Sequence, residues 1–223
     1  MPRIHFHQQL AELKAKLLAM AALSQQALES AVDAYIQRDP ALCQYVRENE
    51  TAINAAQLEV DEVAFELLAK EQPMAIDLRF ILAVIKINGD LERIGDQAMS
   101  IALRTLTLLE DEVIDLPVDF DSMGDYAALM IRTSIQSLLD GDAQMAESVV
   151  DMDDEIDRMN RVAHTDLVKV IEARSDIAAQ ALQAIIISRN LERIADHATN
   201  IAQDVIFWVR GADVRHQLSA ADS

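Results

Sequence analysis

Two stretches of this chain, one hundred residues apart, repeat the same pair of carboxylates. Residues 91–102 and 191–202 agree at eight of twelve positions, and each begins Leu-Glu-Arg-Ile. In each copy a Glu stands four residues before an Asp; the two pairs are Glu92 with Asp96 and Glu192 with Asp196. On a helix this spacing places both carboxylates on one face, a single turn apart. Carboxylate oxygens bind hard and borderline cations, so each copy is a candidate metal site.

Other side chains could complete such a site. Asn200 lies one turn beyond the second pair, where the first copy has only Ser100. His197 stands where the first copy has Gln97, so the first site could be weaker or differ in the number of ions it holds. The predicted metal ligands are Glu92, Asp96, Glu192, Asp196 and Asn200, and the additional candidates are Asp61, Asp153, Asp157 and His197. The expected ion is iron, zinc, manganese or magnesium.

A plainer interpretation is that these acids are solvated on an exposed helix face, which is the commonest position of Glu and Asp. Taking each residue as about 100° of turn, the first acid pair points about 150° away from the apolar stripe that contains Leu91 and Ile94. However, like charges at this spacing slightly destabilise a helix, and chance would not duplicate the whole run. The duplication therefore favours a metal site over a bare solvated face.

The elements that must position these acids are helices. Apolar residues recur at spacings of three and four along most of the chain. The pattern is interrupted by Pro40, by Pro73, at 115–121 and by Gly141, and Ser175 with Asp176 resembles a helix N-cap. We expect an all-α fold of two tandem antiparallel three-helix bundles related by internal duplication. The predicted parts are a first bundle at 1–114, a linker at 115–121, a second bundle at 122–211 and a frayed polar tail at 212–223.

Composition narrows the function. The formal net charge of −19 repels nucleic-acid phosphates and attracts basic protein patches, so no nucleic-acid partner is expected. The one cysteine, Cys43, excludes an intramolecular disulfide and a cysteine-rich metal site. The N-terminus lacks the apolar stretch of a signal peptide, and no uncharged apolar run approaches the roughly 18 residues of a membrane helix. We therefore expect a cytoplasmic protein.

Motifs for catalysis are absent from the sequence. It contains no Gly-rich phosphate loop, no Gly-x-Ser-x-Gly elbow and no Glu-x-x-His motif of di-iron proteins. Arg93 and Arg193 lie between the acids, and we expect them to form salt bridges with a neighbouring helix or with the other half. The chain is therefore predicted not to be an enzyme.

The two motif copies resemble those of the PhoU family of phosphate-signalling regulators. The same resemblance includes Leu-Ala-Lys-Glu-Gln-Pro at 68–73 and Asp-Leu-Arg at 77–79, and it extends from about residue 27 to 211. It implies two three-helix bundles, metal binding at the Glu-x-x-x-Asp motifs and assembly as a homodimer or larger oligomer. It also implies contact with the ATPase subunit of the phosphate ABC transporter and with a sensor histidine kinase, and membrane association only through such partners. The implied role is to restrain phosphate uptake and the phosphate-starvation response when phosphate is plentiful.

Three hypotheses follow. The leading one is a non-enzymatic, metal-binding regulator that acts by protein contact. The first alternative is a metal-dependent phosphohydrolase that uses the clustered carboxylates, which would need an enclosed pocket. The second is a helical adaptor whose acids bind nothing specific.

Overall fold

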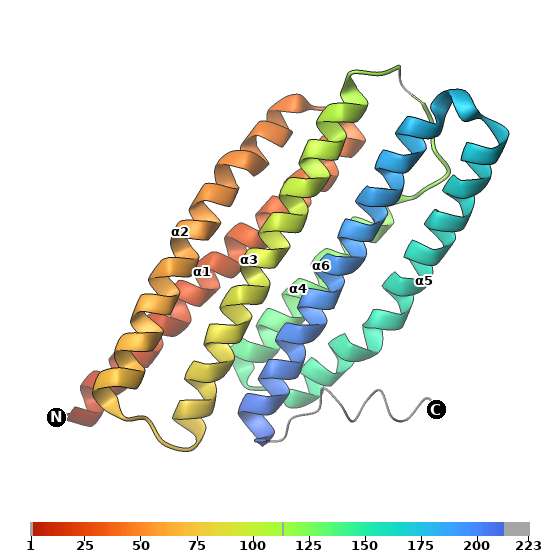
Figure 1. The fold of residues 1–223 in the computed structure, drawn as a ribbon. Helices are drawn as coiled ribbons and strands as arrows, with labels where there is room; N and C mark the ends of the chain where they lie inside the picture. Colours follow the sequence, from red (N-terminus) through yellow and green to blue (C-terminus); the bar gives the residue numbers. More distant parts are fainter. Residues whose placement is uncertain (1, 113, 212–223) are drawn as a thin grey trace.

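The computed structural model describes residues 2–112 and 114–211, and within them it contains six α-helices and no strand (Figure 1). The predicted all-α fold is therefore confirmed, and the predicted tail at 212–223 lies outside the described residues. A short 3-10 turn, Ser175–Ile177, precedes the last helix. The helices are α1 (Pro2–Gln37), α2 (Pro40–Glu71), α3 (Ile76–Leu109), α4 (Phe120–Asp140), α5 (Ala143–Ala173) and α6 (Ala178–Arg210).

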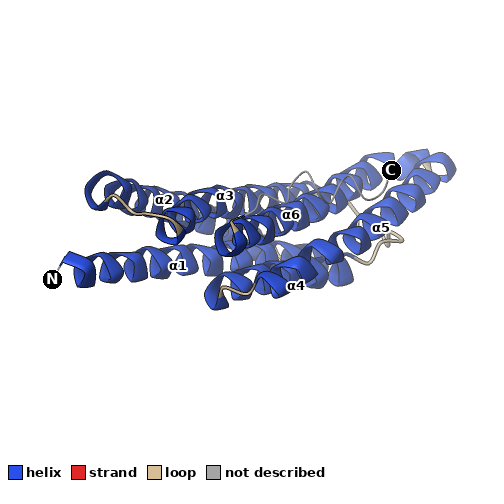
Figure 2. Ribbon diagram, turned by 90° about the horizontal axis from the view of Figure 1, so that it is seen from below, coloured by secondary structure: helices blue, strands red, loops and turns tan. Residues whose placement is uncertain are grey.

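The helices form two layers. Figure 2 shows α2, α3, α6 and α5 side by side in one layer, with α1 and α4 against its other face. Each half contributes three helices joined by short connections, as expected for antiparallel bundles. The two halves meet mainly through α3 and α6, the central helices of the larger layer. One continuous hydrophobic core includes buried residues of all six helices.

The duplication is visible in the positions that are buried. In the first two helices of each half, buried residues correspond at an offset of 103, as Val46 does with Val149. In the third helices the offset is 100, as for Leu91 and Leu191. The caps are duplicated too: Asp39 accepts a hydrogen bond from a backbone N–H at the start of α2, and Asp142, 103 residues later, does the same for α5.

The central helices α3 and α6 run antiparallel, and the motif copies cross at their middle. The Asn190 side chain donates to Ser100 Oγ at 2.9 Å, and at the symmetry-related position Asn200 donates to Asp90 Oδ1 at 3.3 Å. Gly95 of the first copy is buried near this crossing. The fold therefore holds both copies of the acidic motif close together across the boundary between the halves.

Two predicted boundaries differ from the structure. The first two residues of α4 lie inside the predicted linker, because α4 begins at Phe120, where the Asp119 carboxylate accepts from the Ser122 backbone N–H. The prediction that Ser175 and Asp176 cap the last helix is wrong. The Asp176 carboxylate is bound by the Arg174 guanidinium at 2.7 Å, and α6 begins at Ala178 without a side-chain cap.

In residues 2–112 and 114–211, no helix is both long and apolar enough to cross a lipid bilayer.

Candidate functional site

The second motif copy lies against α5, where it meets two further carboxylates. Glu192 and Asp196 of α6 lie close enough to Asp153 and Asp157 of α5 for the four charges to interact. The pKa of Asp196 is raised to about 6, chiefly because surrounding protein atoms displace water and then because Glu192, Asp153 and Asp157 repel its negative charge. Burial is also the main reason that the pKa of Glu192 is raised. We call these four residues the second carboxylate cluster.

Few side chains donate hydrogen bonds to the carboxylates of the second carboxylate cluster. Asp153 Oδ1 accepts a hydrogen bond from Thr199 Oγ1 at 3.1 Å, but burial and the neighbouring acids still raise its pKa. Arg161 reaches Asp157 only at 3.4 Å. Arg193, predicted to bridge to another helix or half, instead acts on Glu192, its neighbour in α6, where it lowers the pKa. The cluster is therefore rich in carboxylate oxygen. Arg189, Arg193 and His197 offset its charge only in part, since the pKa values of Glu192 and Asp196 remain raised.

The first motif copy is different. The Arg93 guanidinium lies 3.5 Å from the Glu92 carboxylate and 3.3 Å from that of Asp96, so the predicted pairing of Arg93 with another helix is wrong. The reason is geometric, since the two acids flank the arginine on the same helix. The pKa of Glu92 is raised by burial and by Asp96, with a smaller effect of Glu50 on α2. Glu50 corresponds to Asp153 at the offset of 103, whereas Asn54 corresponds to the acid Asp157.

The motif acids are also less exposed than their spacing along one helix predicts. The acids are off the hydrophobic core, as predicted, but they are not on an open face. The side chain of Glu92 is 20% exposed and that of Asp96 is 35% exposed. The predicted direction of these acids was taken relative to the first bundle alone, whereas α3 is flanked in its layer by both α2 and α6 (Figure 2). The acids therefore lie in grooves between helices.

His197 and Asn200 meet an acid that the sequence analysis did not single out. His197 Nδ1 lies 2.8 Å from Asp90 Oδ1, and Asn200 Nδ2 donates to the same oxygen. These three residues line a groove of about 560 Å³ between α3 and α6, with Lys86 at its wall. His197 lowers the pKa of both Glu92 and Asp196, so it lies between the two motif copies.

Asp61, another candidate ligand, is engaged elsewhere. Its carboxylate accepts a hydrogen bond from Asn88 Nδ2 at 2.9 Å, and it is not among the groups that shift the pKa of Glu92. Asp90 and Glu50 were missed for different reasons. Nothing in the sequence shows that α3 packs on α6, which brings Asp90 to His197. The offset of 103, in contrast, could have identified Glu50 as the counterpart of Asp153.

The donor sets can be compared with the needs of a metal ion. Among the described residues, no three His, Cys, Asp or Glu side chains are already arranged as ligands of one ion. The chemistry of the second carboxylate cluster nevertheless fits a hard cation, since a cation would relieve the repulsion that raises the pKa of Asp196. The first copy fits less well, because the Arg93 guanidinium already lies within 3.5 Å of both of its acids.

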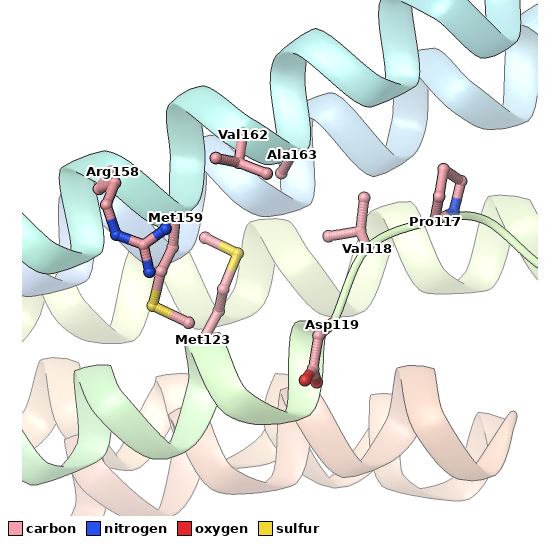
Figure 3. A pocket seen from close by; sticks show the side chains of 8 residues that line it. All are labelled: Pro117, Val118, Asp119, Met123, Arg158, Met159, Val162 and Ala163. Atoms are coloured by element: carbon pink, nitrogen blue, oxygen red, sulfur yellow. The ribbon is translucent and has the colours of Figure 1, made fainter.

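A separate groove of about 170 Å³ lies between the loop before α4 and the helices α4 and α5 (Figure 3). In Figure 3 the side chains of Met123 and Met159 point toward one another, and the Asp119 carboxylate points away from them. The Arg158 guanidinium at its edge is paired with Glu155. The remaining lining residues are apolar, namely Pro117, Val118, Val162 and Ala163. The groove does not bring together an acid, a base and a nucleophile, so it is not a candidate catalytic site.

The chain is similar to known proteins of one family. A model described as the PhoU domain matches the chain twice, over residues 17–105 and 120–205. A protein of Pseudomonas putida named phosphate-specific transport system accessory protein PhoU homolog is 40% identical over 95% of this chain and 83% of its own length. A protein of the same name from Pseudomonas aeruginosa is 38% identical over 95% of this chain and 88% of its own length.

Solved structures agree with the sequence comparisons. The crystal structure of PhoU from Pseudomonas aeruginosa superposes with a TM-score of 0.89 at 36% identity, covering 93% of this chain and 100% of that one. The phosphate transport system regulatory protein PhoU from Streptococcus pneumoniae superposes with a TM-score of 0.86 at 26% identity, covering 94% and 99%. The six-helix arrangement with its internal duplication is therefore shared with these proteins.

Proposed function

The chain belongs to the PhoU family, and on that premise we propose that it is a cytoplasmic regulator of phosphate uptake and of the phosphate-starvation response. The single observation that carries this proposal is the double match to the PhoU domain in one chain. The relatives that support it are named accessory or regulatory proteins of phosphate transport. The proposed direction of control is negative: when phosphate is plentiful, the protein restrains uptake and keeps the starvation response off.

The proposal includes a metal ion. Glu192, Asp196, Asp153 and Asp157 would hold it, and Glu92 with Asp96 would form a weaker second site. A bound cation would neutralise the clustered carboxylates and tie α5 to α6 at the centre of the second half. The raised pKa of Asp196 supports this assignment, since burial and then three neighbouring carboxylates disfavour its charged form.

The partners we propose are proteins. A chain with a net charge of −19 is suited to docking on basic surfaces. The proposed partners are the ATPase subunit of the phosphate transporter, a sensor histidine kinase and a second copy of this chain. Contact with the membrane would be indirect, through the transporter.

The test of the proposed function is genetic. In the host organism, deletion of this chain should switch on a phosphate-starvation promoter in phosphate-rich medium, and the wild-type chain should switch it off again. Ile94→Asp places a charge at a fully buried position and is expected to unfold the protein, so it is the negative control. A promoter that stays off in the deletion strain would contradict the proposal.

A further inference from the structure

The two halves differ sharply in one groove, although the buried positions of their helices correspond. In the second half a groove of about 470 Å³ lies between α5 and α6, beside Glu192. We call it the basic groove. Its other lining residues are Asn160, Arg161, His164, Thr165, Ile185 and Arg189. Three of the six can carry positive charge, in a chain whose net charge is −19.

The first half lacks these cations. At the offsets of 103 and 100, Arg161 corresponds to Leu58, and Arg189 corresponds to Gly89. His164 corresponds to the acid Asp61. Because the buried positions of the halves match while these three do not, the basic groove is not required by the packing of the fold. The first half therefore serves as an internal comparison that points to a function specific to the second half.

Several side chains of the basic groove have N–H groups that donate to no other described residue. Asn160 Oδ1 accepts from Ser188 Oγ at 2.7 Å, which fixes the amide and leaves its NH₂ group as a donor. Arg189 is exposed and makes no hydrogen bond with another described residue, but it lies close enough to Glu192 to lower the pKa of that acid. His164 is also exposed and makes no hydrogen bond with another described residue. Arg161 makes one long contact, 3.4 Å, to Asp157. Two guanidinium groups, an imidazole and an amide thus line one groove with unused N–H groups.

We propose that the basic groove binds a small tetrahedral oxyanion, and that inorganic phosphate is its ligand. The planar guanidinium fork matches phosphate oxygens, and a doubly charged anion gains most from two arginines. Glu192, which lines the same groove, would repel the anion when ionised. A cation in the second carboxylate cluster would remove that repulsion, so the role of the site in signalling rests on the proposed function. The phosphate contacts themselves come from the α5 and α6 side chains.

The test is isothermal titration of the full chain with inorganic phosphate, in chelator-treated protein and again with Mn²⁺ present. Wild-type protein should bind one phosphate per chain in at least one of the two conditions. Arg161→Gln with Arg189→Gln should weaken binding at least tenfold, since charge-assisted hydrogen bonds are worth about 1.5–3 kcal/mol each. The control, Arg47→Gln with Arg132→Gln, removes the same charge from exposed positions outside the groove and should bind as the wild type does.

Two results would overturn the proposal: no saturable phosphate binding by the wild type in either condition, or equal affinity of the groove variant and the wild type. A further titration with sulfate distinguishes a phosphate site from one for any tetrahedral anion. The metal site is tested separately by the uptake of Mn²⁺ by the wild type, because the groove variant removes Arg161, which contacts the proposed metal ligand Asp157. Failure of phosphate binding with intact metal uptake would reject the groove and leave the proposed function standing.

Discussion

The carboxylates of the second carboxylate cluster repel one another, and this repulsion destabilises the folded state. Asp196 lies near Glu192, Asp153 and Asp157, and each of them raises its pKa. Proteins rarely crowd like charges without a compensating cation, and sites that do so are frequently functional. The first copy shows the alternative, because Arg93 lies within 3.5 Å of both of its acids.

Replacing one of the crowded acids should stabilise the metal-free protein. In chelator-treated protein at neutral pH, Asp196→Asn should raise the free energy of unfolding by about 0.5–1 kcal/mol, because each like-charge neighbour costs about 0.2–0.5 kcal/mol. Urea denaturation followed by circular dichroism measures this. The matched control is Asp96→Asn, which loses an ion pair with Arg93 and should not stabilise the protein. A destabilised Asp196→Asn variant would show that repulsion among these carboxylates does not destabilise the folded protein.

The same acid predicts a pH dependence. The pKa of Asp196 is raised from 3.8 to about 6, so the folded chain holds this proton more tightly than the unfolded chain. The free energy of unfolding of chelator-treated protein should therefore rise as the pH falls from 7 toward 5. The window lies above the range in which acids with lowered pKa values, such as Glu147 and Asp176, lose stability. Parallel stability curves for the wild type and Asp196→Asn between pH 5 and 7 would contradict this account.

Residue types and spacing identified the motif acids, but not all of their partners. The pair Glu192 and Asp196 followed from the duplicated run, because an i, i+4 spacing is a local property of a helix. The contact of His197 with Asp90 spans 107 residues and depends on how two helices cross. Periodicity in one helix carries no information on such a crossing, so Asp90 could not be predicted.

At the scale of the element, α3 contains two glycines in different surroundings. A Cβ added at Gly89 would meet nothing within 4 Å, whereas one at Gly95 would lie 2.9 Å from Ile53 Cδ1. The second motif copy has Ala195 at the place of Gly95. The close approach of α2 to α3 therefore leaves no free space for a Cβ at Gly95 unless Ile53 shifts, whereas the helix has open space at Gly89.

Replacing each of these glycines with alanine gives a matched pair of variants. Gly89→Ala should raise the free energy of unfolding by about 0.5–1 kcal/mol, the usual gain in a helix interior. Gly95→Ala should gain less or should destabilise the protein, because Ile53 must move away from the new methyl group. Urea midpoints of the two variants measure the difference. Equal stabilisation by both substitutions would mean that α2 and α3 are not packed this closely.

Most helices could be predicted from the sequence, because their apolar period and their Pro and Gly breaks are local signals. Asp39 and Asp142 cap α2 and α5 at the predicted breaks. The start of α6 was mispredicted, since the side chain of Arg174 competes for the carboxylate of Asp176. A cap residue can be recognised by its type, but its other hydrogen-bonding partners cannot.

For the whole molecule, the contact between α3 and α6 makes the halves interdependent. The Lys86 ammonium lies 3.0 Å from the Asp204 carboxylate across this contact, and Arg79 Nε donates to the Trp208 carbonyl oxygen at 3.1 Å. The hydrophobic core is also continuous between the halves. Tandem bundles could be predicted from the duplicated sequence. Their arrangement in two layers could not, because an apolar stripe does not specify which helix will cover it.

A shared core predicts cooperative unfolding. Calorimetry of metal-free protein should show one transition, and Ile94→Asp should unfold both halves, since it places a charge at a fully buried position of the first half. Ile94→Val is the conservative control and should cost about 0.5–1.5 kcal/mol. Two separate transitions, or an intact second half in Ile94→Asp, would show that the halves fold independently.

The central claim is that the duplicated carboxylate motifs hold metal, and the most direct test is elemental analysis of untagged protein purified without chelator. We expect at least one ion of iron, zinc, manganese or magnesium per chain. Glu192→Ala with Asp196→Ala should abolish most of it, whereas Glu92→Ala with Asp96→Ala should remove less, because the Arg93 guanidinium already lies within 3.5 Å of both of those acids. If the wild type holds no stoichiometric metal even after reconstitution with each of these ions, the claim is contradicted.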